Sequence, residues 1–490
     1  MTTQLRKAVS AAALASLVLG GMAQAATFQV TSRDAPGIGF NDPTPVAPVG
    51  GNSGTTLGQQ RWNVYQAVAQ IWGAALQSNV TITVSAGWEA LQCDASSAVL
   101  GSASSWNGWR DFPNAPIANT WYPSALANKL AGVNIAELYG VPDDGTGYGN
   151  VDIKTQFNIN LGQPNCLAGS TFYLGLDGKA PAGQVNFMAT LLHELGHGLG
   201  FSLFTTSSAN GSRFDNRPSV WEQHMFDSTV GKTWLQMTNT ERVASAINTG
   251  KLAWAGANAV AGVPQTLGQG TAPQLLVGGS GAGTAAGVKA VGTASFGPAL
   301  TTTGVSGNIG RVVDQANGTG LACTALNAAN AAAVAGKIAL VDRGTCSFNV
   351  KVKNAQIAGA IGVLVADNVV AAISGLGGTD PTVTIPSVRI LKTDGDAIKA
   401  ALQKRVRGTA LPQVTARLYA PPTGLYAGAD SSNRPLLYTP NPRQPGSSVS
   451  HWDTSATPNL LMEPFISADL TTSLVPPQDL TLPLLKDLGW

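Results

Sequence analysis

The segment His193-Glu194-Leu195-Gly196-His197 holds the residues best suited to chemistry in this chain. Two imidazoles four residues apart on a helix project from one face, one turn above the other, which is the separation that two ligands of one metal ion need. The glutamate between them points toward the same opening and can act as general base on a metal-activated water. The pattern predicts a zinc hydrolase site with His193 and His197 as ligands and Glu194 as the catalytic residue.

The surroundings of this motif favour a site over a chance match. Residues 185–192 are mostly apolar and compatible with a helix, and Gly200 stands where that helix must stop and turn. The chain has four histidines, and two of them are in this motif. The alternative, two core or solvated histidines with a fortuitous glutamate, does not account for the buried flank and the glycine. We expect a helix over residues 181–200.

A catalytic zinc site needs a third protein ligand, because such sites usually have three and keep a fourth position open. The compact metzincin pattern has a histidine six residues after the second one, but here that residue is Leu203, which cannot ligate. The remaining candidates are Asp215, Glu222, His224 and His451. We favour His451 for its surroundings, since Ser450-His451-Trp452-Asp453 is followed by Asn459-Leu460-Leu461-Met462.

The other candidates have plainer interpretations. His224 is expected to pack or to form a hydrogen bond in a helix with Trp221 and Phe226. Glu222 fits a solvated charge on that helix, although a zinc protease with a glutamate ligand stays open as an alternative. Asp453 can orient a metal ligand or lie at the surface, and the sequence does not choose between these roles.

These motifs resemble the leishmanolysin-like metzincins. The first element matches at residues 193–201, which end in Gly-Phe, and the second matches at His451-Trp452 and at residues 459–462. The resemblance implies an α+β fold of the zincin type, His451 as third ligand and Met462 in a methionine turn beneath the metal. It covers residues 26–264 and 421–490. Pro464 stands where some metzincins carry a tyrosine, so no tyrosine is assigned to transition-state stabilisation.

A second unit is clearest at residues 336–368. Lys337-Ile338-Ala339-Leu340-Val341 predicts a buried strand, Phe348 begins a helix that ends at Gly359, and residues 361–366 predict another buried strand. A strand–helix–strand unit of this length implies a parallel crossover. Residues 385–388 and a helix over 393–403 would complete a small α/β domain.

This unit resembles the protease-associated (PA) domain, at residues 336–348, at Lys351, at Asn354-Ala355-Gln356 and at Gly359-Ala360. The resemblance covers roughly residues 265–420. It implies a non-catalytic insert that governs substrate access or partner contact, and a spacer without a binding role is the alternative.

Four cysteines, Cys93, Cys166, Cys323 and Cys346, allow three disulfide connectivities, and the sequence alone does not choose among them. Proximity within the expected domains favours Cys93–Cys166 and Cys323–Cys346, and the resemblance to the PA domain also supports the second pair. A zinc site made from these four is not expected, because no C-x-x-C pair is present.

The rest of the chain predicts an ordered protein with long loops. A helix is expected over residues 61–77 and strands near 80–84 and 153–159, the latter either a sheet edge that could pair with a peptide or an internal strand. Residues 101–149 are predicted to be irregular and residues 214–254 partly helical. Residues 256–310 are predicted to form β structure that leads into the second unit. Asp143-Asp144 lacks the ligand spacing of a calcium loop.

The N-terminus has the features of a secretory signal peptide over residues 1–25. Arg6 and Lys7 form its basic end, residues 11–20 its apolar stretch and Ala23-Gln24-Ala25 its cleavage site. Loss of these two basic residues from the total of 29 leaves as many basic residues as the 27 acidic ones. Neither a nucleic-acid partner nor a membrane span is expected, and the predicted localisation is secreted or periplasmic.

Together these patterns predict an exported zinc metalloendopeptidase with one Zn²⁺ ion that acts on protein or peptide substrates. The alternative from another class is an exported zinc-containing binding protein with an inactive protease domain and partner binding by the PA unit. The sequence indicates no oligomeric state.

Overall fold

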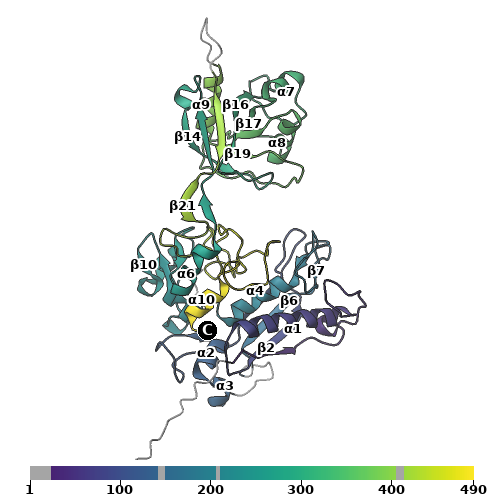
Figure 1. The fold of residues 1–490 in the computed structure, drawn as a ribbon, viewed down its shortest axis with the longest axis vertical. Coiled ribbons are helices and arrows are strands. Elements are labelled where there is room, and N and C mark those ends of the chain that lie inside the picture. Colours follow the sequence, from purple (N-terminus) through teal and green to yellow (C-terminus); the bar gives the residue numbers. More distant parts are fainter. Residues whose placement is uncertain (1–23, 142–148, 150, 206–209, 404–412) are drawn as a thin grey trace, which may run out of the picture. The chain divides into compact units, whose positions relative to one another are not determined.

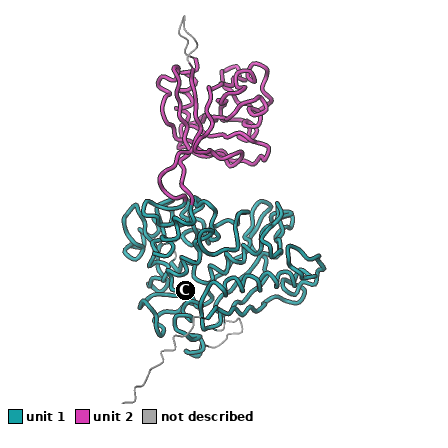
Figure 2. The backbone as a smooth tube through the Cα atoms, in the orientation of Figure 1, with its two compact units in different colours: residues 1–267, 428–490 teal, residues 268–427 magenta. Residues whose placement is uncertain are grey.

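The computed structural model describes residues 24–141, 149, 151–205, 210–403 and 413–490. The chain divides into two compact units, one of residues 1–267 and 428–490 and the other of residues 268–427 (Figure 2). Most of the predicted signal peptide and the pair Asp143-Asp144 lie outside the described residues. Within the described ranges no helix has the length and apolarity needed to cross a membrane.

Unit 1 is built on a four-stranded sheet in the order β1-β2-β6-β3. The strands are β1 (Phe28–Ser32), β2 (Ile82–Glu89), β6 (Ile153–Asn158) and β3 (Gly101–Ser105). The first three run parallel, and β3 runs antiparallel to β6. The predicted strand over 153–159 is therefore internal, and the edge beside it is β3. The edge strand escaped prediction because its sequence, Gly-Ser-Ala-Ser-Ser, has no apolar alternation.

Two long helices pack together in unit 1, and one of them lies against β3 and β6 (Figure 1). They are α1 (Leu57–Ala75) and α4 (Phe187–Leu199). Helix α1 begins earlier than the predicted residue 61, because the Thr56 side chain accepts the N–H of Gln59 and caps the helix there. Helix α4 begins later than the predicted residue 181, because Val185 and Asn186 form strand β8, which pairs with β7.

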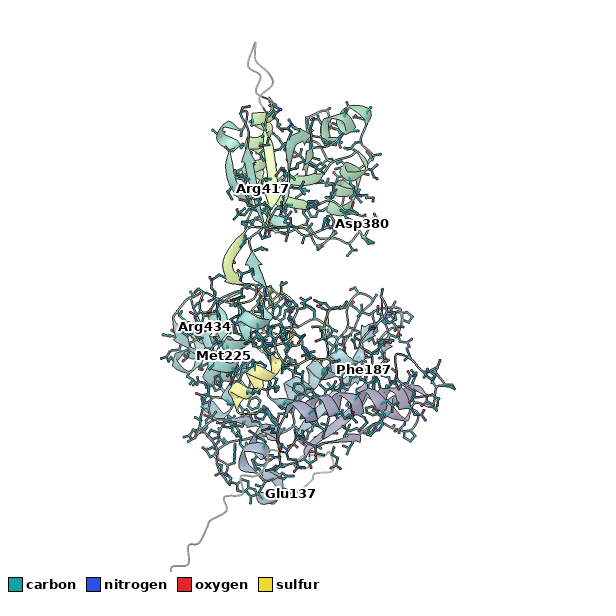
Figure 3. All side chains as sticks on the ribbon, viewed as in Figure 1. Glu137, Phe187, Met225, Asp380, Arg417 and Arg434 are labelled. Atoms are coloured by element: carbon teal, nitrogen blue, oxygen red, sulfur yellow. A yellow bond between two sulfur atoms is a disulfide. The ribbon has the colours of Figure 1, made fainter. Side chains whose placement is uncertain are left out.

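The aromatic ring of Phe187, labelled in Figure 3, joins α4 to the sheet and to α1. Its centroid lies 4.9 Å from that of Phe157 on β6 and 6.1 Å from that of Tyr65 on α1. Phe187 is fully buried. The apolar start of α4 therefore anchors the helix that carries the His-Glu-x-x-His motif.

Shorter elements complete unit 1, and several lie in regions where the sequence predicted otherwise. Residues 101–149, expected to be irregular, contain two helices besides strands, and the stretch expected to be β from Gly256 begins with helix α6. The N-terminus of α6 is capped from a distance, since Asp487 accepts the N–H groups of Asn258 and Ala259. The remaining elements are β4 (Gly108–Trp109), β5 (Tyr122–Pro123), α2 (Ser124–Ala131), α3 (Ile135–Leu138), β7 (Phe172–Tyr173), β8 (Val185–Asn186), β9 (Met225–Asp227), β10 (Lys232–Thr233), α5 (Asn239–Ser245), β11 (Leu252–Trp254), α6 (Ala257–Thr266), α10 (Thr481–Leu488) and the short 3-10 turns Gly39–Asn41, Phe214–Asn216, Val220–His224 and Trp234–Gln236.

Unit 2 is an α/β unit around an eight-stranded sheet in the order β14-β13-β20-β16-β17-β18-β19-β15. Strands β16 to β19 run parallel, as the predicted crossover requires. The helices and strands of the unit are β12 (Gln269–Thr271), β13 (Gln274–Gly278), β14 (Gly287–Ala290), β15 (Gly292–Thr293), β16 (Val305–Arg311), α7 (Ala328–Val334), β17 (Ile338–Asp342), α8 (Phe348–Ile357), β18 (Gly362–Ala366), β19 (Ser387–Ile390), α9 (Lys392–Gln403), β20 (Thr415–Tyr419) and β21 (Pro422–Tyr426).

The parallel strands of unit 2 are buried on both faces. Ile338 and Leu340 of β17 belong to one apolar cluster with Ile398 of α9, whereas Ala339 and Val341 belong to another with residues of α8. Successive side chains of a strand point to opposite faces, so one strand supplies both clusters. This arrangement explains the continuous apolar runs in the sequence.

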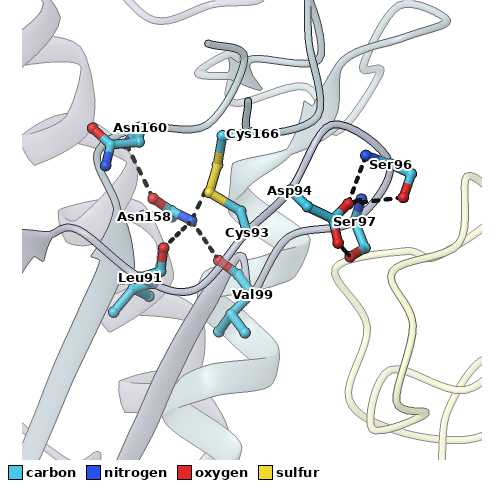
Figure 4. The surroundings of a disulfide bond; sticks show 9 residues. All are labelled: Leu91, Cys93, Asp94, Ser96, Ser97, Val99, Asn158, Asn160 and Cys166. Atoms are coloured by element: carbon cyan, nitrogen blue, oxygen red, sulfur yellow. Dashed lines mark hydrogen bonds between the residues drawn. A yellow bond between two sulfur atoms is a disulfide. The ribbon is translucent and has the colours of Figure 1, made fainter. Parts of the chain in front are cut away.

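Both expected disulfides are present. Cys93 is bonded to Cys166 in unit 1, with 5.0 Å between the Cα atoms, and Cys323 is bonded to Cys346 in unit 2, with 5.7 Å. Asn158, at the end of β6, lies beside the first disulfide. Its side-chain amide donates hydrogen bonds to the carbonyl oxygens of Leu91 and Val99 (Figure 4). The first disulfide therefore links the segment between β2 and β3 to the segment that follows β6.

Candidate metal centre

Helix α4 presents the motif because both of its ends are fixed. Asn186 caps the N-terminus by accepting the N–H of Ala189 at 3.1 Å, and Gly200 ends the helix with φ +128°. Gly200 N–H bonds back to the carbonyl of His197 at 3.2 Å. The two histidines consequently lie one turn apart, with ring centroids separated by 4.7 Å.

His451 lies beside these two rings although it is 254 residues from His197. The three Nε2 atoms form a nearly equilateral triangle: 3.1 Å from His193 to His197, 3.2 Å from His197 to His451, and 3.3 Å from His451 to His193. Among the described residues, these three side chains form the one cluster of histidine, cysteine or acidic groups close enough to share a metal ion.

Main-chain carbonyls fix the direction of all three rings. The Nδ1 atoms of His193, His197 and His451 lie 2.7, 2.7 and 2.8 Å from the carbonyl oxygens of Leu461, Phe201 and Ser447. Because a carbonyl can only accept, each Nδ1 carries the proton and each Nε2 is left with a lone pair. Three lone pairs that face one another repel unless a cation lies between them.

The donor set fits a tetrahedral zinc ion. Zinc binds imidazole nitrogen at about 2.0–2.1 Å, so two nitrogens on a tetrahedral ion are about 3.3 Å apart, close to the Nε2 separations here. Ligating histidines also usually donate their other ring N–H to a carbonyl or carboxylate, as all three do here. His193, His197 and His451 are therefore the residues that would hold the ion.

Burial keeps the imidazoles neutral. Burial, together with the smaller effect of the neighbouring His197, lowers the pKa of His193 to about 3. Burial also lowers the pKa of His197 to about 4 and that of His451 well below its usual range. Neutral imidazole is the form that binds metals, so the rings are ready to ligate over the whole neutral range.

Glu194 borders the same space and contacts the edge strand. The residue is 7% exposed. Burial raises the pKa of its carboxyl group to about 8, although the backbone N–H of Ala103 on β3 acts in the opposite direction. The edge strand thus positions the carboxyl group that the sequence assigns as base.

Met462 packs against helix α4 between the two histidines of the motif. A Cβ atom placed on Gly196 would come within 2.8 Å of the Met462 sulfur, so the methionine packs where only glycine leaves room. The N–H of Leu461, whose carbonyl holds His193, is in turn bound by the buried carboxyl of Asp479 at 2.7 Å. Met462 therefore contacts helix α4 at Gly196, as the expected methionine turn requires.

A cleft with a volume of about 1010 Å³ opens onto the centre. Its walls include residues 98–103, which contain part of β3, the segment 178–186 before α4, and residues 464–468 after Met462. The three histidines and Glu194 lie in the same lining. The cleft thus connects the histidine cluster with the edge strand β3.

The other candidate ligands lie outside the histidine cluster. Glu222 is fully buried and binds Arg213 at 3.0 Å and the N–H of Ser219 at 2.8 Å, so its interpretation as a solvated charge is wrong. Asp215 has a side chain that is 59% exposed. His224 stacks on Trp254 with 4.9 Å between the centroids. It does pack against an aromatic residue, but on a short 3-10 turn rather than a longer helix.

Asp453 orients no histidine. It is 8% exposed, and its carboxylate accepts the N–H and the hydroxyl of Ser455. Both roles considered for it, ligand orientation and a surface position, are therefore wrong. The groups that do orient the rings are main-chain carbonyls, and these leave no mark in a sequence.

Comparison with known proteins identifies part of unit 2. Residues 308–398 match the family model of the PA domain. Unit 2 contains a PA domain. Over 75 residues the chain is 43% identical to vacuolar-sorting receptor 5 of Arabidopsis thaliana, a stretch that covers 14% of this chain and 12% of that protein. The chain thus matches a small part of that relative's length.

Similarities to solved structures are partial. BSAP, a zinc aminopeptidase from Bacillus subtilis, is 24% identical, with 34% of this chain and 35% of that chain covered and a TM-score of 0.21. An aminopeptidase from an Aneurinibacillus species is 21% identical, with 41% and 42% covered and a TM-score of 0.22. At such TM-scores the similarity does not extend to the fold of the chain as a whole.

Proposed function

We propose that this protein is an exported zinc-dependent endopeptidase of the leishmanolysin-like metzincin type. His193, His197 and His451 hold the zinc ion, and Glu194 is the general base. The observation that carries the proposal is the triangle of Nε2 atoms, 3.1 to 3.3 Å on a side, with every Nδ1 proton given to a carbonyl. Such a set of converging lone pairs is stable when a cation fills it.

The chemistry is hydrolysis of a peptide bond. Bound zinc supplies a Lewis acid that polarises the scissile carbonyl and makes water more acidic. Glu194 takes a proton from the attacking water and gives it to the leaving amine, so one water molecule is consumed for each bond broken. The backbone N–H of Ala103 favours the charged form of the Glu194 carboxyl group, which is the form that can accept this proton.

The charge state of Glu194 fits this role once a cation is present. Burial alone raises its pKa to about 8. A positive ion nearby favours the charged form of a carboxyl group and so lowers that pKa. In the zinc-loaded protein the carboxylate is therefore ionised near neutral pH and can accept a proton.

The substrate is a protein or peptide that lies extended in the cleft. Among the described residues, strand β3 pairs with β6 alone, so its other side offers N–H and C=O groups, apart from the N–H of Ala103, to a peptide strand. We propose that unit 1 is the metalloprotease domain and that the PA domain is inserted into it. The bounds expected from the sequence are 26–264, 265–420 and 421–490, and those of the insert lie within a few residues of the bounds of unit 2. In this proposal residues 1–25 are a cleaved signal peptide.

The variant Glu194→Gln tests the proposal. It should keep one zinc ion per chain and lose about 10²- to 10⁴-fold of the rate of casein hydrolysis, because an amide cannot take the proton. Glu137→Gln, on the exposed surface of α3, is the matched control and should leave the rate unchanged.

Two outcomes would contradict the assignment. Wild-type activity in Glu194→Gln would remove Glu194 as the base. A wild-type protein that binds one zinc ion and hydrolyses neither casein nor a peptide library would instead favour the alternative of a binding protein with an inactive protease domain.

A further inference from the structure

Trp490 reaches the end of the metal-binding helix, although it lies 291 residues beyond Leu199. Its indole Nε1–H donates a hydrogen bond of 2.8 Å to the carbonyl oxygen of Leu199, the last residue of α4. We propose that Trp490 is a positioning residue for His197, which it holds in the direction needed to bind zinc. This inference rests on the proposed zinc site.

The carbonyl that Trp490 binds belongs to a helix end. The last four carbonyl groups of an α-helix have no partner within the helix. Here Gly200 N–H bonds to His197 O at 3.2 Å and Phe201 N–H bonds to Gly196 O at 3.0 Å, which satisfies two of the last carbonyls of α4. The indole supplies a donor to Leu199 O and so fixes the turn formed by residues 199–201.

That turn sets the direction of His197. Phe201 O accepts the Nδ1 proton of His197 at 2.7 Å, so a shift of the turn rotates the imidazole and moves its Nε2 atom. The Phe201 ring is fully buried and lies 4.9 Å from the ring of Trp221 and 5.2 Å from that of Trp452. Trp452 directly follows His451, so the same turn also contacts the segment of the third ligand.

Trp490 is itself held in a fixed place. Helix α10 ends at Leu488, and Gly489 adopts a left-handed conformation with φ +117°. Gly489 N–H bonds to Lys486 O and Trp490 N–H to Leu485 O, both at 3.1 Å, which is the hydrogen-bond pattern of a Schellman motif. The Lys129 ammonium of α2 donates to Gly489 O. Hydrogen bonds thus fix Trp490 in place, connect it to Leu199, and connect Phe201 to His197.

Helix α10 also packs against the turn through an apolar contact. A Cβ atom placed on Gly200 would lie 3.3 Å from the Leu488 methyl carbon Cδ1, so the end of α10 fits closely over Gly200. Replacement of Trp490 by phenylalanine keeps an aromatic ring, removes the N–H donor and reduces the size of the ring system. A control in which another tryptophan is replaced by phenylalanine loses the same ring volume, so the comparison of the two variants isolates the hydrogen bond to Leu199.

The test is the zinc affinity of Trp490→Phe, measured by competition with a chromophoric chelator. Loss of a group that orients a ligand typically weakens metal binding about 10- to 100-fold, and we expect the low end of this range, about 10-fold. Trp121→Phe is the matched control, because its indole also donates to a main-chain carbonyl, that of Phe214, at 3.2 Å. The control should bind zinc as the wild type does.

A second variant covers the case in which Trp490→Phe does not fold. Gly489→Ala keeps the indole and strains the turn that directs it, so zinc binding should weaken by a smaller factor. The spectrum of the Co²⁺-substituted protein should change in both variants, because ligand geometry changes. A folded Trp490→Phe with a lower melting temperature but wild-type zinc affinity and cobalt spectrum would overturn the proposal and leave Trp490 a purely structural role.

The result does not depend on hydrolysis. If the wild type binds zinc through the three histidines and cleaves no peptide, the proposed function fails and the role of Trp490 is still measured. If His193→Ala leaves zinc affinity unchanged, the zinc site itself is wrong and both proposals fail.

Discussion

The buried carboxylate of Asp367 in unit 2 and the histidine cluster of unit 1 satisfy their polar atoms in opposite ways. In unit 2 the carboxylate of Asp367, 1% exposed, binds the guanidinium groups of Arg343 at 2.9 Å and Arg389 at 2.5 Å. In unit 1 three neutral imidazoles turn their lone pairs toward one point. The carboxylate of Asp367 is satisfied by arginines of its own unit, whereas in the function that we propose the histidine cluster is completed by a cation. This contrast separates groups that stabilise a fold from groups that await a ligand.

The largest effect is expected from removal of His451. His451→Ala leaves two of the three imidazoles. Loss of a residue that only forms a hydrogen bond to a ligand weakens metal binding by up to about 100-fold, so loss of a ligand itself should weaken zinc binding more. Casein hydrolysis should also be lost. Equilibrium dialysis with metal analysis measures this. Glu222→Ala is the comparison, since Glu222 binds Arg213 and Ser219. Zinc loss in Glu222→Ala alone, with His451→Ala fully loaded, would replace His451 by Glu222 as ligand.

The buried ion pair of unit 2 should give the next largest effect. Asp367→Asn leaves the Arg389 guanidinium, 8% exposed, without its carboxylate, and breaking such a pair costs about 3–5 kcal/mol of unfolding free energy. Hydrogen exchange resolved by peptide should show lost protection in β18 and α9 and unchanged protection in α4. Weaker zinc binding in this variant would contradict the expectation that Asp367 stabilises unit 2 alone.

The free energy of unfolding of the metal-free protein should depend on pH through the buried carboxyl group of Glu194. Burial raises the pKa of Glu194 from 4.5 to about 8, so this group stabilises the fold below pH 4.5 and that contribution is lost as the pH rises toward 8. Glu194→Gln should therefore stabilise the zinc-free protein by about 1–3 kcal/mol at pH 7, with a smaller difference at pH 5. Urea unfolding in the presence of a chelator measures both, with Glu137→Gln as control. An equal difference at the two pH values would contradict the role of burial.

The smallest effect is expected at Asp453. Its carboxylate binds Ser455 rather than a histidine, so Asp453→Asn should change zinc affinity by less than about twofold, below the range seen for groups that orient ligands. The same dialysis measurement applies. A tenfold loss would show that Asp453 acts on His451 through the chain between them.

The sequence predicted those parts of the molecule in which local pattern and packing agree. Apolar runs and helical spacing located α4, β17, α8 and β18, because each buries a face that its own residues define. Strand β3 was missed, since its small residues pair with β6 and carry no alternation of their own. The N-terminus of α6 was missed because its cap, Asp487, comes from α10.

The site was predictable in its side chains but not in its supports. Histidine and glutamate spacing identified His193, Glu194 and His197, and the Trp and Met around the distant motif pointed to His451. The carbonyls of Leu461, Phe201 and Ser447 belong to the backbone and could come from any residue type. Burial of Glu222 was not predictable either, because its partner Arg213 lies on a segment without regular spacing.

The use of carbonyl acceptors for all three rings has a consequence for genetics. Alanine scanning deletes side chains but preserves every carbonyl, so a scan of Leu461, Phe201 and Ser447 would not delete the groups that aim the imidazoles. Substitutions of other residues should disturb this cluster when they change the backbone conformation. Examples are the introduction of proline into a turn and the replacement of a turn glycine. Outside the three histidines and Glu194, substitutions should therefore be least tolerated at the bends around the rings.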